Sequence, residues 1–509
     1  MPLTLRDVYM ALDYGVLNGG DQVVFSGVST DTRTLTPGDL FVALMGPQTD
    51  GHQHIAAALR AGAAGLIVSQ PVVASPSIPT LRVPDTEVAY GLLARFWRDR
   101  FAIPVVGVTG SVGKTTVKEM LALALSPLGL VLKTAASQNN ETGVPKALLQ
   151  LTPDHKAAVV EMGMRGSGQI AYLCGIARPT VGVLTVIADN HLELLGSRDA
   201  IADAKGELLE ALPPNGLAVL NTADPYTPRL RAKTSARVLT YAAADDAVQT
   251  EGDWKFTVRG VEVKINSLSK HDIGNALAAL TVAEALGVSL TDAAAALQAY
   301  GPPPMRMSVV QTAWGGTVLN DAYNASPASV ASALQTLAVT PGKRKIAFLG
   351  DMRELGTRAE EAHRELGDVI KNLGGIDALY TVGPLAALIP NAAVHFADSG
   401  EAARFAEELA LMPGDVVLVK GSRAMTMEKV AAALEPTPSR SSPTLPQREG
   451  KDKLRSWTEG FTSSRLPLFI CHPSRCGRGR EGRAGVGTLK GPIHGRSQIA
   501  APCHGAACH

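Results

Sequence analysis

The stretch Pro104–Thr116 constrains the fold of this chain more than any other. It opens with an apolar run, Pro-Val-Val-Gly-Val-Thr, which predicts a buried strand, and a glycine-containing turn follows directly. After the turn, apolar residues recur at helical spacing, which predicts a helix that begins where the turn ends. A strand, a glycine loop and a helix N-terminus together form a place where backbone amides and the helix dipole can hold an anion.

Lys114 and Thr115 stand at the start of this predicted helix and suit a nucleoside triphosphate. A lysine here reaches the β- and γ-phosphates, and the hydroxyl that follows completes a Mg²⁺ shell. The usual phosphate-loop pattern has a glycine six residues before the lysine, where this chain has Val108. A plain strand–helix turn with a surface lysine is the alternative, and we favour an ATP site. The expected ATP-binding residues of this loop are Thr109, Gly110, Ser111, Val112, Gly113, Lys114, Thr115 and Thr116.

Length and composition are typical of a soluble protein with several domains. The chain has 509 residues, of which 46% are hydrophobic and 19% charged. Its apolar runs are far shorter than the ~20 residues that a membrane-spanning helix needs. The N-terminus has no basic region leading into an apolar one, as an export signal would. We therefore expect a cytoplasmic protein with no membrane span and no nucleic-acid partner.

Residues 436–509 differ in character from the rest of the chain. They carry twelve Lys and Arg against four Asp and Glu, a net charge of +8, so the remaining 36 basic and 43 acidic residues give −7. Pro, Ser, Arg and Gly dominate this tail without lasting periodicity, which predicts disorder. Four of the five cysteines lie in it near histidines, a composition that zinc sites share. Because no predicted strand or helix organises them, we favour a disordered and non-native extension. Only Cys174 remains in the body, which suits a reducing compartment.

Repeated strand–helix patterns predict an α/β fold with three units before the tail. The stiff segment Gly301–Pro304 marks the junction before the last unit. Trp254–Ile265 alternates around Arg259-Gly260 and predicts a hairpin. The predicted domains are a small N-terminal α/β unit at 1–100, a central ATP-binding unit with a mostly parallel sheet at 101–300, and a Rossmann-like unit at 301–435.

Two polar residues follow predicted strands of the central unit. Glu161 ends one strand, and His191 comes soon after the strand predicted at Val181–Ile187. Ligands of parallel sheets bind beyond the carboxyl ends of the strands, so both residues should lie at the edge that carries the phosphate loop. Carboxylate and imidazole both bind divalent ions, which favours a metal site over a merely solvated or structural role. In the N-terminal unit, the polar loop Ser29–Arg33 is compatible with a polar ligand or with simple turn chemistry.

These motifs together resemble the Mur ligases, the ATP-dependent amide-forming enzymes of peptidoglycan precursor synthesis. The resemblance covers residues 1–435 and rests on the phosphate loop, Glu161–Gly163 and Asn190–Leu192. It implies the three-domain fold, with ATP and Mg²⁺ as cofactors. Lys205 stands where the family has a carbamylated lysine, and an unmodified lysine paired with a phosphate is the alternative.

The resemblance also implies roles for individual residues. Ala136–Gln138 replaces the Gly-Asn step that usually precedes the family's asparagine pair. The implied catalytic residues are Lys114, Lys205 and His191. The implied metal ligands are Thr115, Glu161, His191 and carbamylated Lys205. Further nucleotide contacts are Asn275, Arg306 and Asp321. The loop Ser29–Arg33 matches the family's uridine-nucleotide loop. Substrate contacts are Ser29, Asp31, Arg33, Asn139, Asn140, Thr142, Tyr323 and Asn324.

Within the family, two segments resemble the members that add D-alanyl-D-alanine to UDP-N-acetylmuramoyl-tripeptide. These are Leu349–Gly356 and Tyr323–Pro327, while the Asp-Asn-Pro-Arg motif of the diaminopimelate-adding members is absent. The resemblance thus implies a monomeric ligase that works through an acyl phosphate and gives ADP and phosphate. The alternatives are a Mur-type ligase for a single amino acid, a P-loop NTPase that switches conformation on hydrolysis, and a nucleotide-binding protein without activity.

Overall fold

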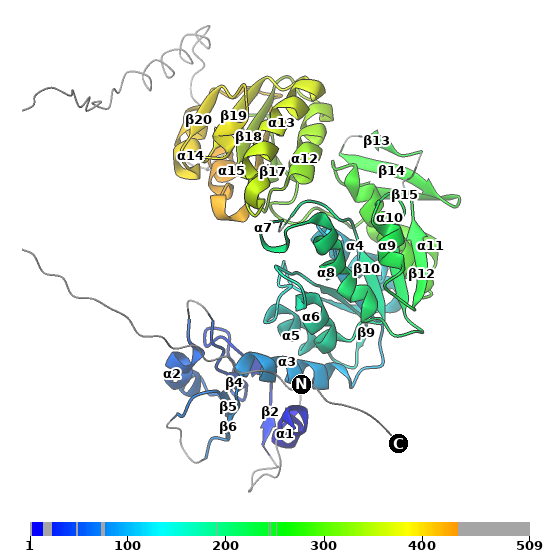
Figure 1. The fold of residues 1–509 in the computed structure, drawn as a ribbon, viewed down its shortest axis with the longest axis vertical. Helices are drawn as coiled ribbons and strands as arrows, with labels where there is room; N and C mark the ends of the chain where they lie inside the picture. Colours follow the sequence, from blue (N-terminus) through cyan, green and yellow to red (C-terminus); the bar gives the residue numbers. More distant parts are fainter. Residues whose placement is uncertain are drawn as a thin grey trace, which may run out of the picture. The chain divides into compact units, whose positions relative to one another are not determined.

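The structure is a computed structural model, and it shows a mixed α/β chain with parallel sheets (Figure 1). This confirms the predicted fold class. His191 and the tail with its Cys–His pairs lie outside the described residues. No helix in the described part of the chain is both long and apolar enough to cross a membrane. The described residues are 3–13, 23–46, 49–72, 77–190, 192–242, 244, 246–250 and 252–435.

The N-terminal part is built on a small parallel sheet. Its elements are β1 (Leu3–Thr4), α1 (Leu5–Leu12), β2 (Val24–Phe25), β3 (Val28–Ser29), β4 (Leu40–Val42), α2 (Ile55–Arg60), β5 (Gly65–Val68), β6 (Thr80–Arg82) and α3 (Thr86–Arg98). The strand order is β3-β4-β5-β6. Phe41 and Leu66 pack with α2 on one face, while Val42 and Ile67 belong to the cluster that includes α1 and α3. Asp85 caps α3, because its side chain accepts hydrogen bonds from the first amides of that helix.

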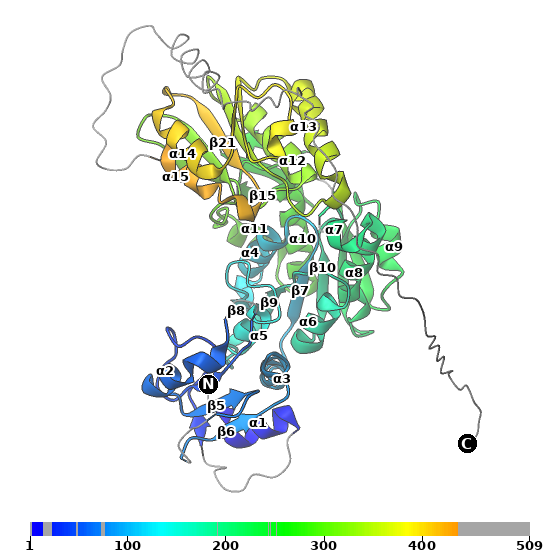
Figure 2. The same cartoon turned by 60° about the vertical axis from the view of Figure 1, so that its left-hand side comes forward.

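The central part is built on a six-stranded sheet in which every strand pair is parallel. Its first elements are β7 (Val105–Thr109), α4 (Lys114–Ala124), β8 (Leu130–Lys133), α5 (Gly143–Leu148), β9 (His155–Glu161), α6 (Gln169–Ala177), β10 (Val181–Leu184), α7 (Leu192–Leu195), α8 (Arg198–Glu210), β11 (Leu217–Asn221), α9 (Thr227–Arg231) and β12 (Arg237–Tyr241). The strand order is β12-β11-β10-β7-β9-β8, so β7 lies between β9 and β10 (Figure 2). The chain reverses its direction of travel across the sheet beside β7, and such a switch point is where ligands of open α/β sheets bind.

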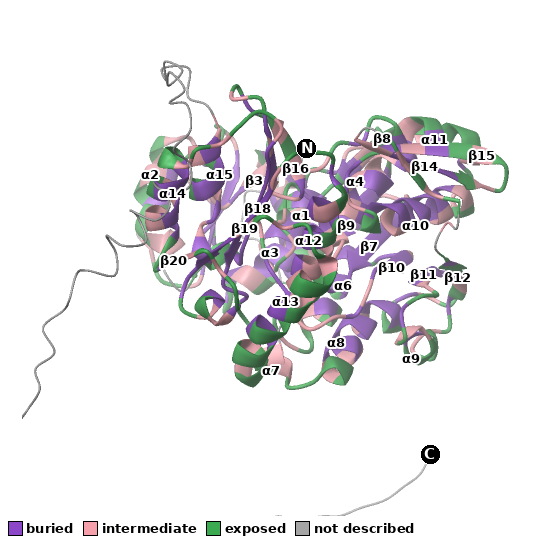
Figure 3. Cartoon of the chain, turned by 90° about the horizontal axis from the view of Figure 1, so that it is seen from above, coloured by how far each residue is buried: buried purple, intermediate pink, exposed green. Residues whose placement is uncertain are grey.

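Helices cover both faces of this central sheet. The remaining elements are β13 (Val248–Thr250), β14 (Asp253–Val258), β15 (Val261–Asn266), α10 (His271–Ala285) and α11 (Leu290–Leu297). Residues of α4, α10 and α11 form the core on one face, and residues of α5, α6 and α8 form it on the other. Figure 3 shows β7 and β10 in the purple of buried residues. This double cover explains why β7 reads as a continuous apolar run.

The predicted hairpin is confirmed. Strands β14 and β15 pair antiparallel, with Val258 opposite Val261. The two residues between them, Arg259 and Gly260, have φ values of 45° and 82°. A two-residue turn with positive φ at both positions matches the right-handed twist of the flanking strands.

The strand predicted at Val181–Ile187 is shorter in the structure, so that prediction is wrong at its C-terminal end. β10 stops at Leu184. The next residues leave the sheet because they bind the phosphate loop instead: Thr185 Oγ1 donates to the Val112 carbonyl at 2.6 Å. Apolar character continued the predicted strand, but the Thr185 side chain, the Val186 carbonyl and the Ala188 amide bond the phosphate loop, and the Ile187 amide donates to Asp224 Oδ2 at 2.6 Å.

The C-terminal part is a second open sheet. Its elements are β16 (Ser308–Gln311), β17 (Thr317–Asp321), α12 (Pro327–Val339), β18 (Lys345–Gly350), α13 (Ala359–Leu373), β19 (Ala378–Val382), β20 (Val394–Phe396), α14 (Ser399–Glu408), β21 (Val416–Lys420) and α15 (Glu428–Leu434). The order is β16-β17-β21-β18-β19-β20, parallel except for the edge strand β16. Helices α12 and α13 pack on one face, and α14 and α15 on the other.

Candidate active site

Two glycines shape the phosphate loop between β7 and α4. Gly110 has φ 148°, and a Cβ atom there would lie 1.9 Å from Thr185 Oγ1. Gly113 has φ 88°, and a Cβ atom there would lie 2.7 Å from Asn275 Oδ1. Both positions therefore require glycine. Val108, where the usual pattern has its first glycine, is a fully buried residue of β7, so the loop begins later and is shorter.

Side chains of the loop hold it to the segment after β10. The Ser111 amide donates to the Val186 carbonyl at 2.7 Å. Ser111 Oγ donates to the Ala188 carbonyl at 3.0 Å, and Asn190 Nδ2 donates to the Ser111 carbonyl at 3.1 Å. Thr109 Oγ1 donates to the Met162 carbonyl at 2.9 Å. The predicted nucleotide residues Thr109 and Ser111 thus use their hydroxyls to set the shape of the loop.

Lys114 begins α4 and turns back over the loop. Its Nζ donates to the Gly110 carbonyl at 2.8 Å. Burial lowers the pKa of the Lys114 ammonium, while the Glu161 carboxylate raises it and Arg306 lowers it further. Gly113 at the N-cap has no side chain to cap the first amides of the helix. Those amides and the ammonium together provide the donors that a phosphate chain needs.

Two buried oxygens beside the phosphate loop could serve as ligands of Mg²⁺. Both residues are buried: Thr115 is 3% exposed and Glu161 is 1% exposed. Thr115 Oγ1 and Glu161 Oε2 have no hydrogen-bond partner among the described residues. An unpaired buried polar atom costs about 1–3 kcal/mol, and hydroxyl and carboxylate oxygens are ligands that Mg²⁺ takes. The donor set therefore fits the ion that the sequence predicted.

Glu161 is held in place by the segment before α5. Its amide donates to Thr134 Oγ1 at 3.1 Å, and its Oε1 accepts from Asn139 Nδ2 at 2.7 Å. Asn140 Oδ1 instead accepts from the Gly143 amide at 3.0 Å. Thus Asn139, predicted as a substrate contact, also orients a predicted metal ligand, while Asn140 supports the start of α5, where Thr142 donates to it at 3.2 Å.

Lys205 of α8 is buried, with 1% exposure. Burial lowers its pKa well below the ordinary lysine value, and the charge of Lys114 acts in the same direction. The structure therefore places Lys205 within electrostatic range of the phosphate-loop lysine. A neutral amine is the form of lysine that reacts with CO₂, so this environment suits the carbamate that the resemblance implied.

The predicted metal set is only partly described by the structure. His191 lies outside the described residues, so its role stays a prediction. Across the described ranges, no group of three or more His, Cys, Asp or Glu side chains is placed to hold a metal ion. The predicted metal ligands among the described residues are Thr115, Glu161 and Lys205. Only Glu161 is a His, Cys, Asp or Glu side chain, so these residues do not form such a group.

Asn275 of α10 lies against the loop on another side. Its Oδ1 faces Gly113, and its Nδ2 donates to Asp272 Oδ1 at 2.9 Å. Asp272 is itself buried and accepts from Ser267 Oγ at 2.6 Å, and burial raises its pKa. Asp272 therefore orients Asn275, and neither this role nor that of Ser267 was predicted.

The predicted residues of the C-terminal part gather near the end of β17. The Arg306 guanidinium lies 4.0 Å from the centre of the Tyr323 ring and donates to Ser137 Oγ at 3.2 Å. Asp321 pairs with Lys420, which is 2% exposed and also donates to the Asn324 carbonyl at 2.9 Å. Sequence reasoning missed Lys420, although it ends an apolar strand as Glu161 does.

The predicted uridine loop lies on a different sheet. Ser29 ends β3, and its Oγ donates to the Asp31 carbonyl at 3.1 Å. Asp31 and Arg33 pair with each other, with Arg33 Nη2 2.7 Å from Asp31 Oδ2. Hydrogen bonds from Arg33 lower the pKa of Asp31 to about 2. The loop thus lies at the carboxyl edge of the N-terminal sheet, and its charges are already paired.

Lys118 is the principal site residue that sequence reasoning missed. It lies on α4 one turn after Lys114, and it is fully buried. Its Nζ lies 3.7 Å from Glu161 Oε2. Helical spacing could have found it, because Lys118 shares a face of the helix with Leu121 and Leu125.

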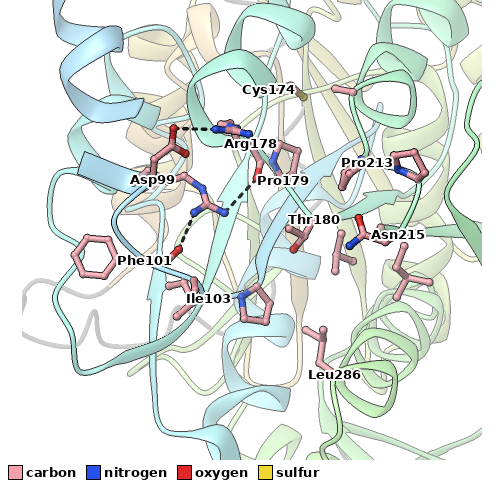
Figure 4. A pocket seen from close by; sticks show the side chains of 18 of the residues that line it. Asp99, Phe101, Ile103, Cys174, Arg178, Pro179, Thr180, Pro213, Asn215 and Leu286 are labelled. Carbon is pink, nitrogen blue, oxygen red and sulfur yellow. Dashed lines mark hydrogen bonds and ion pairs between the residues drawn. The ribbon is translucent and has the colours of Figure 1, made fainter. Parts of the chain in front are cut away.

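A large cavity lies elsewhere among the described residues. It has a volume of 1060 Å³ and is lined by residues that precede β7, β10 and β11, at the amino edge of the central sheet (Figure 4). Arg98 in its wall donates to the carbonyls of Ala177 at 2.8 Å and Phe101 at 2.9 Å. Asp99 pairs with Arg178 at 2.9 Å. This cavity is therefore separate from the phosphate loop, and its buried charge is already satisfied.

A phosphate loop at the switch point of a parallel sheet, flanked by two further α/β sheets, defines a nucleotide-dependent enzyme of several domains. Three family models match the chain: "Mur ligase family, catalytic domain" at residues 24–97, "Mur ligase middle domain" at 108–283 and "Mur ligase, glutamate ligase domain" at 305–423. The chain belongs to the Mur ligase family.

The alignments with similar proteins span nearly the whole length of those proteins. The UDP-N-acetylmuramoyl-tripeptide--D-alanyl-D-alanine ligases of Synechocystis sp. and Escherichia coli are 38% and 37% identical to it, over 85% and 82% of this chain and 97% and 96% of their own. A crystal structure of MurF from Acinetobacter baumannii is similar with a TM-score of 0.78 and 32% identity, covering 85% of this chain and 99% of that one. MurF ligase from Thermotoga maritima in complex with ADP gives 0.72 and 31%, covering 80% and 96%.

Proposed function

We propose that the chain joins D-alanyl-D-alanine to UDP-N-acetylmuramoyl-tripeptide with the use of ATP, in cytoplasmic peptidoglycan precursor synthesis. The structural observation that supports the use of ATP and Mg²⁺ is a pair of buried oxygens beside the phosphate loop, Thr115 Oγ1 and Glu161 Oε2, which lack hydrogen-bond partners among the described residues. Relatives that share at least 37% identity over more than four fifths of the chain bear this activity in their names. Residues 1–100, 101–300 and 301–435 form the three proposed domains of a monomer.

The reaction must activate a carboxylate, because its leaving group would otherwise be oxide. The tripeptide carboxylate attacks the γ-phosphorus of ATP, the bond to the β-phosphate oxygen breaks, and an acyl phosphate and ADP form. The dipeptide amine then attacks the acyl carbon and gives a tetrahedral intermediate. The amine loses a proton, the bond from carbon to the phosphate oxygen breaks, and amide and phosphate leave.

Residues of the loop offset the charge on the transferred phosphoryl group. The Lys114 ammonium and the first amides of α4 converge there, and such fixed donors act mainly by electrostatic stabilisation. Thr115 and Glu161 would hold Mg²⁺, together with His191 and a carbamate on Lys205. Bound Mg²⁺ would neutralise phosphate charge.

Three further groups of residues are assigned to the substrates. Besides the loop, the nucleotide would contact Asn275, Arg306 and Asp321. The incoming amine would bind near Tyr323 and Asn324. The uridine nucleotide and its peptide would contact Ser29, Asp31, Arg33, Asn139, Asn140 and Thr142.

Reconstitution of the reaction tests this proposal. The protein is incubated with ATP, Mg²⁺, a UDP-N-acetylmuramoyl-tripeptide and either D-alanyl-D-alanine or single amino acids, and phosphate and product mass are followed. We expect phosphate and amide product only with all three substrates and with the dipeptide. Turnover with a single amino acid alone would move the chain to another branch of the family, and phosphate release from ATP alone would contradict a ligase.

We also propose that residues 1–435 contain all of the catalytic machinery. The family models end at residue 423, and the composition changes at Pro436. Removing residues 437–509 should leave kcat/KM for each substrate within about threefold of the full chain, about 0.7 kcal/mol. Loss of folding, or stoichiometric zinc in the full chain with lower activity after its removal, would contradict this.

A further inference from the structure

We propose that Lys118 is a positioning residue that aims the Glu161 carboxylate at the metal. The inference rests on the proposed function, because it takes Glu161 as a ligand of Mg²⁺. Lys118 would contact neither nucleotide nor peptide substrate. It would act through Glu161 and through the segment from Ala136 to Asn139.

The burial of Lys118 is the first observation. The residue is 0% exposed, although lysine is rarely buried completely unless it is paired. Moving an ammonium out of water costs several kcal/mol, so its partners must compensate. A lysine kept at this cost one helical turn after Lys114 indicates a role that an apolar residue of the same volume would not fill.

The partners of Lys118 are the second observation. Its Nζ donates to the Ala136 carbonyl and lies 3.1 Å from Glu119 Oε1. It lies 3.7 Å from Glu161 Oε2, which is within ion-pair range but longer than a hydrogen bond. The ammonium therefore attracts Glu161 Oε2 and leaves the lone pairs of that oxygen available.

The other side of Glu161 completes the arrangement. Its Oε1 accepts from Asn139 Nδ2 at 2.7 Å, and Asn139 follows Ala136 in the same short segment. Lys118 thus acts on Glu161 directly through charge and indirectly by holding the segment that carries Asn139. One oxygen is hydrogen-bonded. The other is buried without a hydrogen-bond partner among the described residues and is directed by the ammonium.

The sign of the effect on metal binding separates positioning from simple charge. If Lys118 acted only as a nearby positive charge, removing it would strengthen the binding of a divalent cation. If it aims Glu161, removing it lets the carboxylate turn and weakens binding. A purely structural lysine would change stability and leave metal binding as it was.

The test measures binding of β,γ-methylene-ATP to the full chain with and without Mg²⁺, by calorimetry, for the native protein and Lys118→Met. We expect the Mg²⁺-dependent gain in analogue affinity to fall at least fivefold in the variant. Analogue affinity without metal should stay within twofold, because the phosphate loop is intact. Lys133→Met is the matched control: Lys133 also pairs with Glu119, but its side chain is 45% exposed. It should change neither quantity.

A double variant provides the second measurement. In a Glu161→Gln background, Lys118→Met should cause no further loss of the metal-dependent gain, because the residue acts through Glu161. If Lys118→Met does not fold, as judged by thermal melting, Lys118→Gln answers the same question, since it keeps a donor for the Ala136 carbonyl.

Three outcomes would overturn the inference: an unchanged gain, an increased gain, or an additive loss in the double variant. In each of these the native protein still shows the gain, so the proposed function stands. A native protein without any Mg²⁺-dependent gain would instead remove the metal role of Glu161, and both proposals would fail together.

Discussion

The two edges of the central sheet differ in whether their buried polar groups are hydrogen-bonded within the protein. At the carboxyl edge, Thr115 Oγ1 and Glu161 Oε2 are buried without a hydrogen-bond partner among the described residues. At the amino edge, the guanidinium of Arg98, a residue 7% exposed, donates to the carbonyls of Ala177, Phe101 and Arg178. The amino edge has the large cavity, yet its buried charge is fully engaged.

This difference indicates which edge is built for a ligand. Folded proteins pair nearly all their buried polar groups, so unpaired ones mark places where something else completes the pairing. A cavity alone carries no such information. At the carboxyl edge, polar groups are kept at a cost in stability. At the amino edge, similar groups contribute to stability, and substitutions should therefore separate activity from folding.

The largest effect should come from Lys114→Ala at the carboxyl edge. Loss of a phosphate-clamping charge typically costs ~3 kcal/mol or more in the transition state, so kcat should fall by at least about a hundredfold. The melting temperature should stay within a few degrees, because the ammonium bonds only a loop carbonyl of its own turn. Steady-state kinetics and thermal melting check both parts. A Lys114→Ala variant with a much lower melting temperature and an unchanged kcat would contradict this, because Lys114 would then contribute to stability and not to activity.

Arg98→Met tests the amino edge. The change leaves three buried or partly buried carbonyls without their donor, and we expect a loss of about 3 kcal/mol in unfolding free energy. The kcat of the folded variant should be unchanged. Denaturant unfolding and kinetics on folded protein measure the two quantities. Arg95→Met, on an exposed arginine of the same cavity, is the control and should change stability by less than about 0.5 kcal/mol. A fall in kcat for Arg98→Met alone would give the amino edge a functional role.

Lys205→Met tests whether a buried lysine at the carboxyl edge lowers stability, through the pH dependence of unfolding. The pKa of Lys205 is far below its unfolded value, so the unfolded chain binds one more proton between those two pKa values. In CO₂-free buffer, this lysine makes native stability rise with pH over that window, by up to about 1.4 kcal/mol per unit. The methionine variant lacks this slope. Its advantage in stability over the native chain should therefore be largest at the acid end of the window and shrink as pH rises. Parallel stability curves for the two proteins would show that Lys205 stays protonated when folded.

Ala136→Gly should give the smallest effect. Ala136 has φ 46°, in the left-handed region that costs an ordinary residue about 1–2 kcal/mol, while glycine adds about 0.5–1 kcal/mol of chain entropy. We expect a net stabilisation of under about 1 kcal/mol without a change in the Lys118 contact, which uses the carbonyl. Thermal melting checks this, with Ala135→Gly as the control that should destabilise slightly. Destabilisation of equal size by both changes would remove the strain argument.

Local patterns in the sequence were enough to predict part of the molecule. The apolar run of β7, the glycines at 110 and 113 and the helical spacing after Lys114 lie within one short stretch, so the phosphate loop could be predicted without tertiary information. The hairpin at Arg259-Gly260 is another local feature, because its strand pairing is set by the two-residue turn. The parallel sheets followed from repeated strand–helix units in the same way.

Tertiary structure decided what depends on residues far apart in the chain. β10 ends early because Thr185 binds the phosphate loop, which lies more than seventy residues before it. Lys118 meets Glu161 only because β9 lies beside β7 and α4 packs over both. Lys420 meets Asp321 across neighbouring strands that lie 99 residues apart in sequence. Periodicity can predict that such a residue is buried, but the partner that its charge needs is chosen by the order of strands in the sheet, because that order brings distant side chains within a few ångströms.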